Sequence, residues 1–283
     1  MTAWARRLPG PPHPPELPEG ARPRWPPGYG FAAMGAGTAA VVVASVPLLP
    51  VVLSSTVEGG LGALALLLLV VVQDAGYMGA AVGFAHLRRE RPRAWHFGLR
   101  AAPLRRTLLI TTAATVAILG FELGFAELAG IDESDTDELG TDEGFVPALA
   151  FSLMAIVVAP VAEEFFFRAF FYRALRNKLR VWLACLITSV VFAALHLQYV
   201  TTPLVFVIIA VFAVGTCLVY EATGSLFSVV AIHAIFNTLA TAGTDAGYAV
   251  PIAVGAAVLV ACVLLPRKLG PAPSPFPRTA LAQ

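Results

Sequence analysis

The sequence predicts an all-α membrane protein, a polytopic bundle of about eight transmembrane helices with disordered, proline-rich termini. Apolar residues make up 58% of the 283 residues and charged residues 13%, and the mean hydropathy is +0.77, well above that of soluble domains. Apolar windows of about 20 residues, the length that spans a bilayer core, recur along the chain. The ten-residue alternation of a transmembrane barrel strand is absent from the sequence.

The two ends of the chain are too polar and too rich in proline to form a core. We therefore interpret residues 1–30 and 266–283 as disordered tails. No apolar stretch begins before about residue 32, so a cleaved secretory signal is not expected. Between the tails we expect one transmembrane helical domain at 31–265, whose motif-bearing core is 146–243.

Eight apolar windows are long enough to be spans, at 31–53, 61–86, 106–128, 146–171, 181–200, 204–221, 226–243 and 248–265. Basic clusters precede the first window, separate the second from the third, and follow the fourth and the eighth. If all eight windows span, every basic cluster falls on one side. The excess of Lys and Arg in cytoplasmic loops then places both termini in the cytoplasm of a cell membrane. The acidic segment 132–143 falls on the other side, as a solvated loop.

Charge and cysteine content exclude some classes of partner and chemistry. The net charge is +1 and no concentrated basic face is present, so membrane lipid is an expected partner and nucleic acid is not. Cys185, Cys217 and Cys262 lie in separate apolar stretches, which is typical of small buried hydrophobic residues.

An ionisable cluster, EEFFFR at residues 163–168, lies inside the fourth window. A charged side chain at the centre of a membrane helix costs roughly 2.5 to 3.5 kcal/mol, so such a cluster indicates a functional site with partners. Two later apolar windows supply candidates, because one contains FAALH at 192–196 and another contains HAIFN at 233–237. A carboxylate pair, two histidines and an asparagine are thereby predicted to meet inside the membrane.

The spacing within these motifs predicts separate roles for the two carboxylates. Glu164 and Arg168 are four residues apart and can form an ion pair on one helix face. Glu163 lies about 100° round the helix and is left without a charged partner, which suits a general base. His196 follows the basic turn at Arg180 by about as many residues as Glu163 precedes it, so antiparallel helices bring both to similar depth.

His233 and Asn237 share a helix face, where they can hydrogen-bond an oxygen that becomes negative as a carbonyl is attacked. A carboxylate with an imidazole can deprotonate a water, so the set suffices for amide hydrolysis. Counting from the turn at Gly224 puts His233 nearer the basic side than His196. Either this helix starts deep in the bundle or the expected boundary is off by a turn.

Three further features surround the cluster. Pro160 removes a backbone hydrogen bond ahead of the carboxylates, which either opens a pocket or reflects the frequency of proline in membrane helices. The phenylalanines at 165–167 and 170–171 are interpreted as lipid-facing and packing residues. Asp74 falls near the middle of the second window and needs a partner there, for which Arg168 or a histidine of the site could serve.

Taken in order, APVAEEFFFR at 159–168, FAALH at 192–196, and TGS at 223–225 followed by HAIFN resemble the CPBP family. These are the CAAX-protease and bacteriocin-processing intramembrane enzymes, also called the Abi family. The resemblance covers roughly residues 146–240 and follows the order E-E-x-x-x-R, F-x-x-x-H, H-x-x-x-N. It implies an eight-helix membrane protease, a hydrolase that cleaves a peptide bond near the membrane. Among its residues it implies catalytic Glu163 and His196, oxyanion donors His233 and Asn237, and supporting Glu164 and Arg168.

The resemblance leaves the metal open, because such proteins are often labelled metalloproteases. Zinc would find Glu163, His196 and His233 as three ligands, yet no H-E-x-x-H pair is present and a glutamate-activated water needs no ion. We favour the glutamate mechanism. The expected substrate is a hydrophobic or lipidated peptide, and nothing in the sequence shows whether it is prenylated.

Two other functional classes remain alternatives. One is a non-catalytic scaffold or bacteriocin-immunity protein that binds a peptide or partner, which would survive Glu163→Ala where hydrolysis would not. The other is a proton-coupled transporter, but the paired broken helices in two similar halves that favour one are not seen.

Overall fold

The computed structural model describes residues 23–48, 50, 60–87, 91–130, 145–196, 204–242 and 248–269. These residues are almost entirely helical and include no strand, which confirms the all-α fold. The α-helices are α1 (Pro27–Ser45), α3 (Gly60–His86), α4 (Leu104–Ala129), α5 (Phe145–Leu153), α6 (Ala159–Glu164), α7 (Arg173–Arg176), α8 (Val181–Ala194), α9 (Val205–Thr223), α10 (Leu226–Ala242) and α11 (Ala249–Leu264). Two π-helical stretches, η6 (Met154–Val158) and η7 (Phe165–Tyr172), join α5, α6 and α7 into one continuous helical stretch, and the 3₁₀ turns are η3 (Val46–Leu48), η4 (Ala94–Phe97) and η9 (Leu265–Lys268).

Apolar helices occupy all eight predicted windows. In the described part of the chain, six helical stretches are long and apolar enough to cross a membrane, and α8 and α10 are shorter apolar helices. This pattern makes the chain an integral membrane protein. The 14 residues of α8 extend only about 21 Å, less than the about 30 Å of a bilayer core. The predicted span 181–200 is longer than this helix, because α8 ends at Ala194, two residues before the predicted site residue His196.

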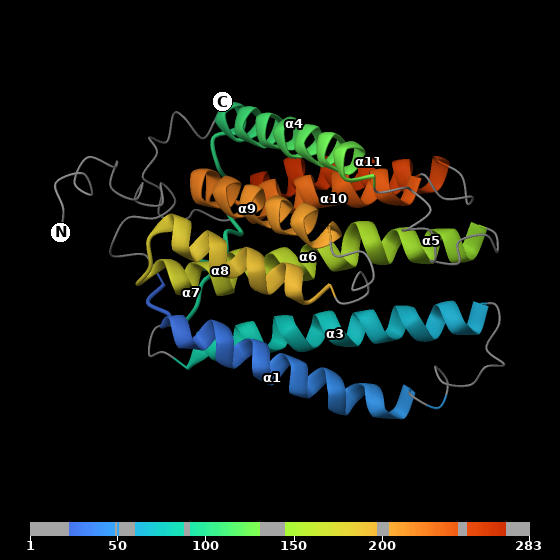
Figure 1. Ribbon diagram of the computed structural model, residues 1–283. Coiled ribbons are helices and arrows are strands. Elements are labelled where there is room, and N and C mark those ends of the chain that lie inside the picture. The colour runs from blue at the N-terminus through green and yellow to red at the C-terminus, as the bar shows by residue number, and fades with distance from the viewer. Residues whose placement is uncertain are drawn as a thin grey trace.

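The helices form successive layers in Figure 1. α4 lies against α9 and α10, and α11 packs on α10; α10 in turn packs on η6 and α6. The continuous α5–α7 stretch with α8 forms the next layer, and α3 and α1 cover its other side. The carboxylate cluster is on α6, so it lies in the middle of the bundle.

Hydrogen bonds tie together one end of the bundle, the left end in Figure 1. Arg100 Nε donates to the carbonyl of Gly224 (3.1 Å), and the Leu226 N–H donates to the carbonyl of Gly98 (3.0 Å). The Asn177 amide donates to the carbonyl of Trp25 (2.8 Å). The helix ends that carry the described basic clusters thus share one end, as the sequence predicts. Their side of the membrane stays a prediction, and segment 132–143 lies outside the described residues.

Ordered structure begins earlier than the predicted boundary at residue 31. The side chain of Trp25 is 3% exposed, and its ring centroid lies 5.0 Å from that of Phe97 and 5.1 Å from that of Phe170. Pro27 then starts α1, a position that proline favours because the first helical N–H needs no partner. Residues 1–22 and 270–283 lie outside the described residues, so the disorder expected there stays a prediction.

The five phenylalanines of η7 do not face lipid, which corrects half of the prediction. Each is at most 7% exposed, and they pack on one another and on aromatic rings of neighbouring elements, including Tyr77, Phe97 and Phe192. The reason is the position of η7, which has neighbours on every side: α1, α3, α8, α9 and η4. The predicted packing role is therefore confirmed.

Candidate active site

Glu164 and Arg168 form the predicted ion pair. Nη1 of Arg168 donates to Oε1 of Glu164 over 2.9 Å, and both side chains are fully buried. The guanidinium carbon lies 4.4 Å from the ring centroid of Phe192, so an aromatic face covers the cation. A buried pair of this kind is costly to break, because removing one member leaves the other charge without compensation. The pair therefore fixes Glu164 in place.

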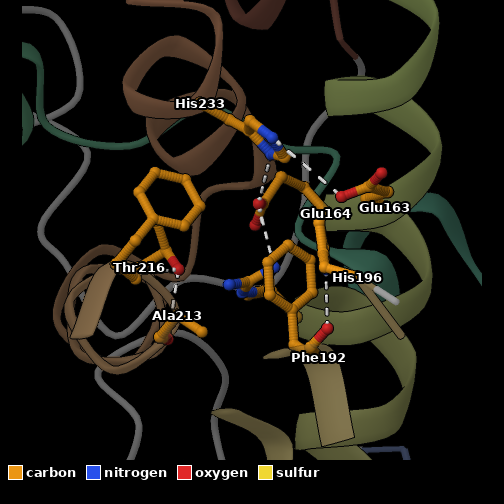
Figure 2. A network of polar contacts seen from close by, with 9 residues as sticks. Glu163, Glu164, Phe192, His196, Ala213, Thr216 and His233 are labelled. Carbon is orange, nitrogen blue, oxygen red and sulfur yellow. Dashed lines mark hydrogen bonds and ion pairs between the residues drawn. The ribbon is translucent and has the colours of Figure 1, made fainter. Parts of the chain in front are cut away.

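The imidazole of His233 lies between the two carboxylates, as Figure 2 shows. Its Nδ1 is 2.8 Å from Oε1 of Glu164, and its Nε2 is 4.0 Å from Oε2 of Glu163. The prediction that Glu163 has no charged partner is thus incomplete, because a protonated His233 would be one. An ionised carboxylate only accepts hydrogen bonds, so Nδ1 is the donor to Glu164. A His233 that also donates from Nε2 is then an imidazolium.

His233 reaches this depth because α10 starts deep in the bundle, which was one of the two alternatives left open by the sequence. Thr223, Ser225 and Leu226 at the preceding turn are each at most 3% exposed. The segment around Gly98 and Arg100 covers this turn through the two hydrogen bonds described above. The turn therefore does not lie at the surface, where counting residues would place it.

His196 follows the last residues of α8, and its tautomer is set by its own helix. Its Nδ1 lies 2.8 Å from the carbonyl of Phe192, which only accepts, so Nδ1 carries the hydrogen. Nε2 is left as an acceptor for a water hydrogen. The ring also packs on Phe192, with centroids 4.8 Å apart.

Glu163 and His196 share a cavity of about 190 Å³. It lies between α3, α6, η7 and the end of α8, and is lined by Gln73, Asp74, Tyr77, Ala162, Glu163, Phe166, Phe167, Leu195 and His196. The Glu163 side chain is 23% exposed and that of Glu164 is fully buried. Oε2 of Glu163 and Oδ2 of Asp74 have no hydrogen-bond partner. A polar cavity with free acceptors suits bound water and a reacting group.

His233 and Asn237 do not line this cavity. Asn237 instead donates from Nδ2 to the carbonyl of Ala155 in η6, over 2.6 Å. That carbonyl is free because the Ala159 N–H bonds to Met154, and the next residue, Pro160, has no N–H. Asn237 thus satisfies a backbone group that Pro160 leaves unpaired. Sequence reasoning missed this role, although Pro160 was its signal.

A metal does not fit the residues as they lie. Among the described residues, no group of three His, Cys, Asp or Glu side chains gathers at a spacing that could hold an ion. The set Glu163, His196 and His233 therefore forms no ligating cluster.

Asp74 was predicted to need a partner in the membrane, for which Arg168 or a histidine of the site was the candidate. Arg168 is engaged by Glu164, and Asp74 instead faces the cavity that Glu163 lines. Its signal in the sequence was a lone carboxylate in a long apolar window. Gln73 and Tyr77 of the same helix also line the cavity, and neither was predicted to be there.

Comparisons with known proteins fall on the part of the chain that carries these residues. A protein-family model described as type II CAAX prenyl endopeptidase, Rce1-like, matches residues 145–239, about a third of the chain. No curated protein and no solved structure matches. The matched residues run from α5 to α10 and include Glu163, Glu164, Arg168, His196, His233 and Asn237. Segment 145–239 therefore carries the signature of the Rce1-like CAAX endopeptidases, which confirms the resemblance to the CPBP intramembrane protease family and supports an endopeptidase of this type.

Proposed function

We propose that this protein is an intramembrane endopeptidase in which Glu163 and His196 activate a water molecule. The observation that carries the proposal is their convergence on one cavity at the centre of a membrane bundle. The Phe192 carbonyl holds His196 in the tautomer whose Nε2 accepts a hydrogen. Glu163 contributes a carboxylate whose side chain is 23% exposed and lines the cavity. Both groups can therefore accept hydrogen bonds from the same water.

In the first step, this water attacks the carbonyl carbon of the scissile peptide bond and gives a proton to Glu163. A carbon–oxygen bond forms, and the carbonyl oxygen becomes an oxyanion. His233 as an imidazolium can donate to it from Nε2, and Glu164 stabilises that cation from the opposite nitrogen. Asn237 does not line the cavity, so its second amide hydrogen can serve the same oxyanion only where the substrate extends the site toward α10.

In the second step, the oxyanion collapses and the carbon–nitrogen bond breaks. The proton held by Glu163 passes to the leaving amine, so one water has been added across the peptide bond and the site returns to its starting state. Glu164 and Arg168 take no part in proton transfer. Arg168 fixes Glu164, and Glu164 accepts the hydrogen bond that positions the imidazole of His233 beside Glu163.

The family match extends the proposal to the substrate class. CAAX endopeptidases of this family act on prenylated peptides, so we propose a prenylated or otherwise hydrophobic peptide as substrate, met within membrane lipid. We retain the proposal that both termini are cytoplasmic, because the described basic residues gather at one end of the bundle.

The test compares peptide termini in membranes of cells that lack this protein and are complemented with wild type, Glu163→Gln or Glu127→Gln. Glu127 is an exposed carboxylate of α4, so its variant controls for loss of a charge in the membrane region. We expect wild type and Glu127→Gln to generate the same new termini, and Glu163→Gln to slow their formation by about 10² to 10⁴-fold, the contribution of a general base. Folding of each variant is checked by its unfolding temperature in detergent.

Unchanged termini with Glu163→Gln would contradict the proposal. If in addition a partner co-purified equally with wild type and Glu163→Gln, the scaffold or immunity alternative would replace it.

The same cleavage, reconstituted with purified protein, decides the metal question. We expect its rate to be unchanged after prolonged treatment with a zinc chelator, because the described acidic and histidine residues form no ligating cluster. Loss of cleavage that zinc restores would show a metal mechanism and return Glu163, His196 and His233 to the role of ligands.

A further inference from the structure

A second and larger cavity lies on the opposite face of α10 from the carboxylate site. Its volume is about 800 Å³, and it lies between α4, α10 and α11. α10 contributes Phe227, Ser228, Ala231 and Ile235, whose spacing places them on one face of the helix. His233 lies two residues beyond Ala231, about 200° round the helix. We call this cavity the α4–α11 groove.

The groove has an apolar wall with one cationic end. Along α4 it runs from Leu104 to Val116, which is about 18 Å of helix. Half of a bilayer core is about 15 Å, so the groove has the length of one lipid chain in one leaflet. Arg267 lines the groove at the basic end of the bundle, and its side chain is exposed. No Asp, Glu or His is among the lining residues.

Two hydroxyl groups inside the groove lack partners. Ser228 is 3% exposed, and its Oγ has no hydrogen-bond partner; the same holds for Oγ1 of the part-buried Thr111. A pure hydrocarbon would leave both unsatisfied, which is costly in an apolar environment. Both oxygens are buried as the side chains lie, and a rotation of each side chain toward the groove would let the ester oxygens of an amphiphile satisfy them.

We propose that the α4–α11 groove binds an anionic phospholipid, with its phosphate at Arg267, its ester oxygens at Ser228 and Thr111, and one acyl chain along α4. A phosphate suits an exposed arginine at a membrane surface. The lipid chain of a peptide substrate fits the groove less well, because α10 separates the groove from Glu163. No residue of the carboxylate cavity lies on α4, α10 or α11.

The test measures lipid binding to the purified, delipidated full chain, so it does not depend on the proposed activity. The unfolding temperature is followed as phosphatidylglycerol or phosphatidylcholine is added, since a ligand that binds the folded state raises it. We expect phosphatidylglycerol to stabilise wild type more than phosphatidylcholine does. Arg267→Gln should weaken phosphatidylglycerol binding about fivefold, which corresponds to the about 1 kcal/mol that one basic residue contributes.

Lys268→Gln is the matched control, because Lys268 is also exposed and basic but does not line the groove. A second pair of variants tests the binding of the acyl chain separately from that of the headgroup. Ala231→Phe should fill the groove and abolish stabilisation by either lipid, whereas Ala240→Phe, on an exposed position of the same helix, should not.

Equal binding of both lipids would overturn the preference for an anionic headgroup, and equal effects of Arg267→Gln and Lys268→Gln would overturn the placement of the phosphate at Arg267. If Ala231→Phe were still stabilised by lipid, the lipid would not bind in the groove. Stabilisation by farnesol but not by phosphatidylglycerol would show that an isoprenoid chain, and not a phospholipid, is the occupant.

Discussion

Glu163 and Glu164 are neighbours in sequence and both lie beside His233, but they differ in burial and in their other contacts. Glu164 is enclosed, paired with Arg168 and bonded to His233, so both of its interactions hold structure. Glu163 faces a cavity, and its Oε2 has no hydrogen-bond partner. One step along the helix thus separates a positioning carboxylate from one that is available to react.

Asp74 is expected to reduce the stability of the protein and support its activity. A carboxylate without a partner at Oδ2 in a membrane helix is costly, so Asp74→Asn should raise the unfolding temperature in detergent. The same change removes an acceptor from the cavity shared with Glu163 and should slow cleavage about tenfold, a loss of about 1.4 kcal/mol of transition-state stabilisation.

Glu122→Asn serves as the control, because Glu122 is a part-buried carboxylate of α4 that does not line this cavity. It should leave the cleavage rate unchanged. A lower unfolding temperature for Asp74→Asn would show that Asp74 has a stabilising partner.

At the scale of elements, the proline of α6 and the asparagine of α10 form one structural unit. Pro160 supplies no N–H, the carbonyl of Ala155 is left free by the π-helical η6, and Asn237 crosses from α10 to bond it. The unusual helix geometry ahead of the carboxylates is thereby linked to the helix that carries His233. π-helical segments are often found at functional sites, and here one has an identifiable cause.

This link predicts a coupling that a double-mutant cycle can measure. In wild type, Asn237→Ala should lower the free energy of unfolding by about 1 kcal/mol, because the part-buried carbonyl of Ala155 loses its donor. In a Pro160→Ala background the restored N–H can serve that carbonyl, so Asn237→Ala should cost clearly less. Unfolding in detergent gives the free energy of unfolding of wild type, the two single variants and the double variant. Additive effects would show that Pro160 and Asn237 are not coupled.

Across the whole molecule, one short segment controls how deep α10 begins. Gly98 has φ +75°, and a Cβ there would lie 2.8 Å from Oη of Tyr220 and 2.9 Å from the backbone nitrogen of Leu226. Its carbonyl accepts from that same nitrogen. Only glycine therefore lets the segment lie close enough to cover the turn before α10.

Gly98→Ala is expected to push this segment off the turn, shift α10 and separate His233 from the carboxylates. We expect a lower unfolding temperature together with slower cleavage. Gly130→Ala is the control, since Gly130 also has positive φ (+63°) but has nothing within 4 Å of an added Cβ. Gly130→Ala should lower the free energy of unfolding by only about 1 to 2 kcal/mol, the cost of a non-glycine residue in the left-handed conformation, and leave activity intact. Equal effects of the two variants would contradict a role for crowding at Gly98.

The sequence predicts much of the fold and of the site, because both depend on local patterns. Apolar windows locate the helices, and four-residue spacing correctly pairs Glu164 with Arg168. What it misses depends on contacts between distant segments. The depth of His233 is set by Gly98 and Arg100, more than a hundred residues earlier, and the engagement of Asn237 is set by Ala155. The burial of the η7 phenylalanines likewise follows from neighbours that periodicity does not reveal.

α10 presents His233 to the carboxylates on one face and Ser228 to the α4–α11 groove on the other. A helix moves as a rigid body, so an occupant of the groove that shifts α10 also changes the distances from His233 to Glu163 and Glu164. The bilayer would then act as an allosteric effector of proteolysis, with lipid composition setting the rate. By thermodynamic linkage the influence runs both ways, and substrate binding would change the affinity of the groove for its lipid by the same factor.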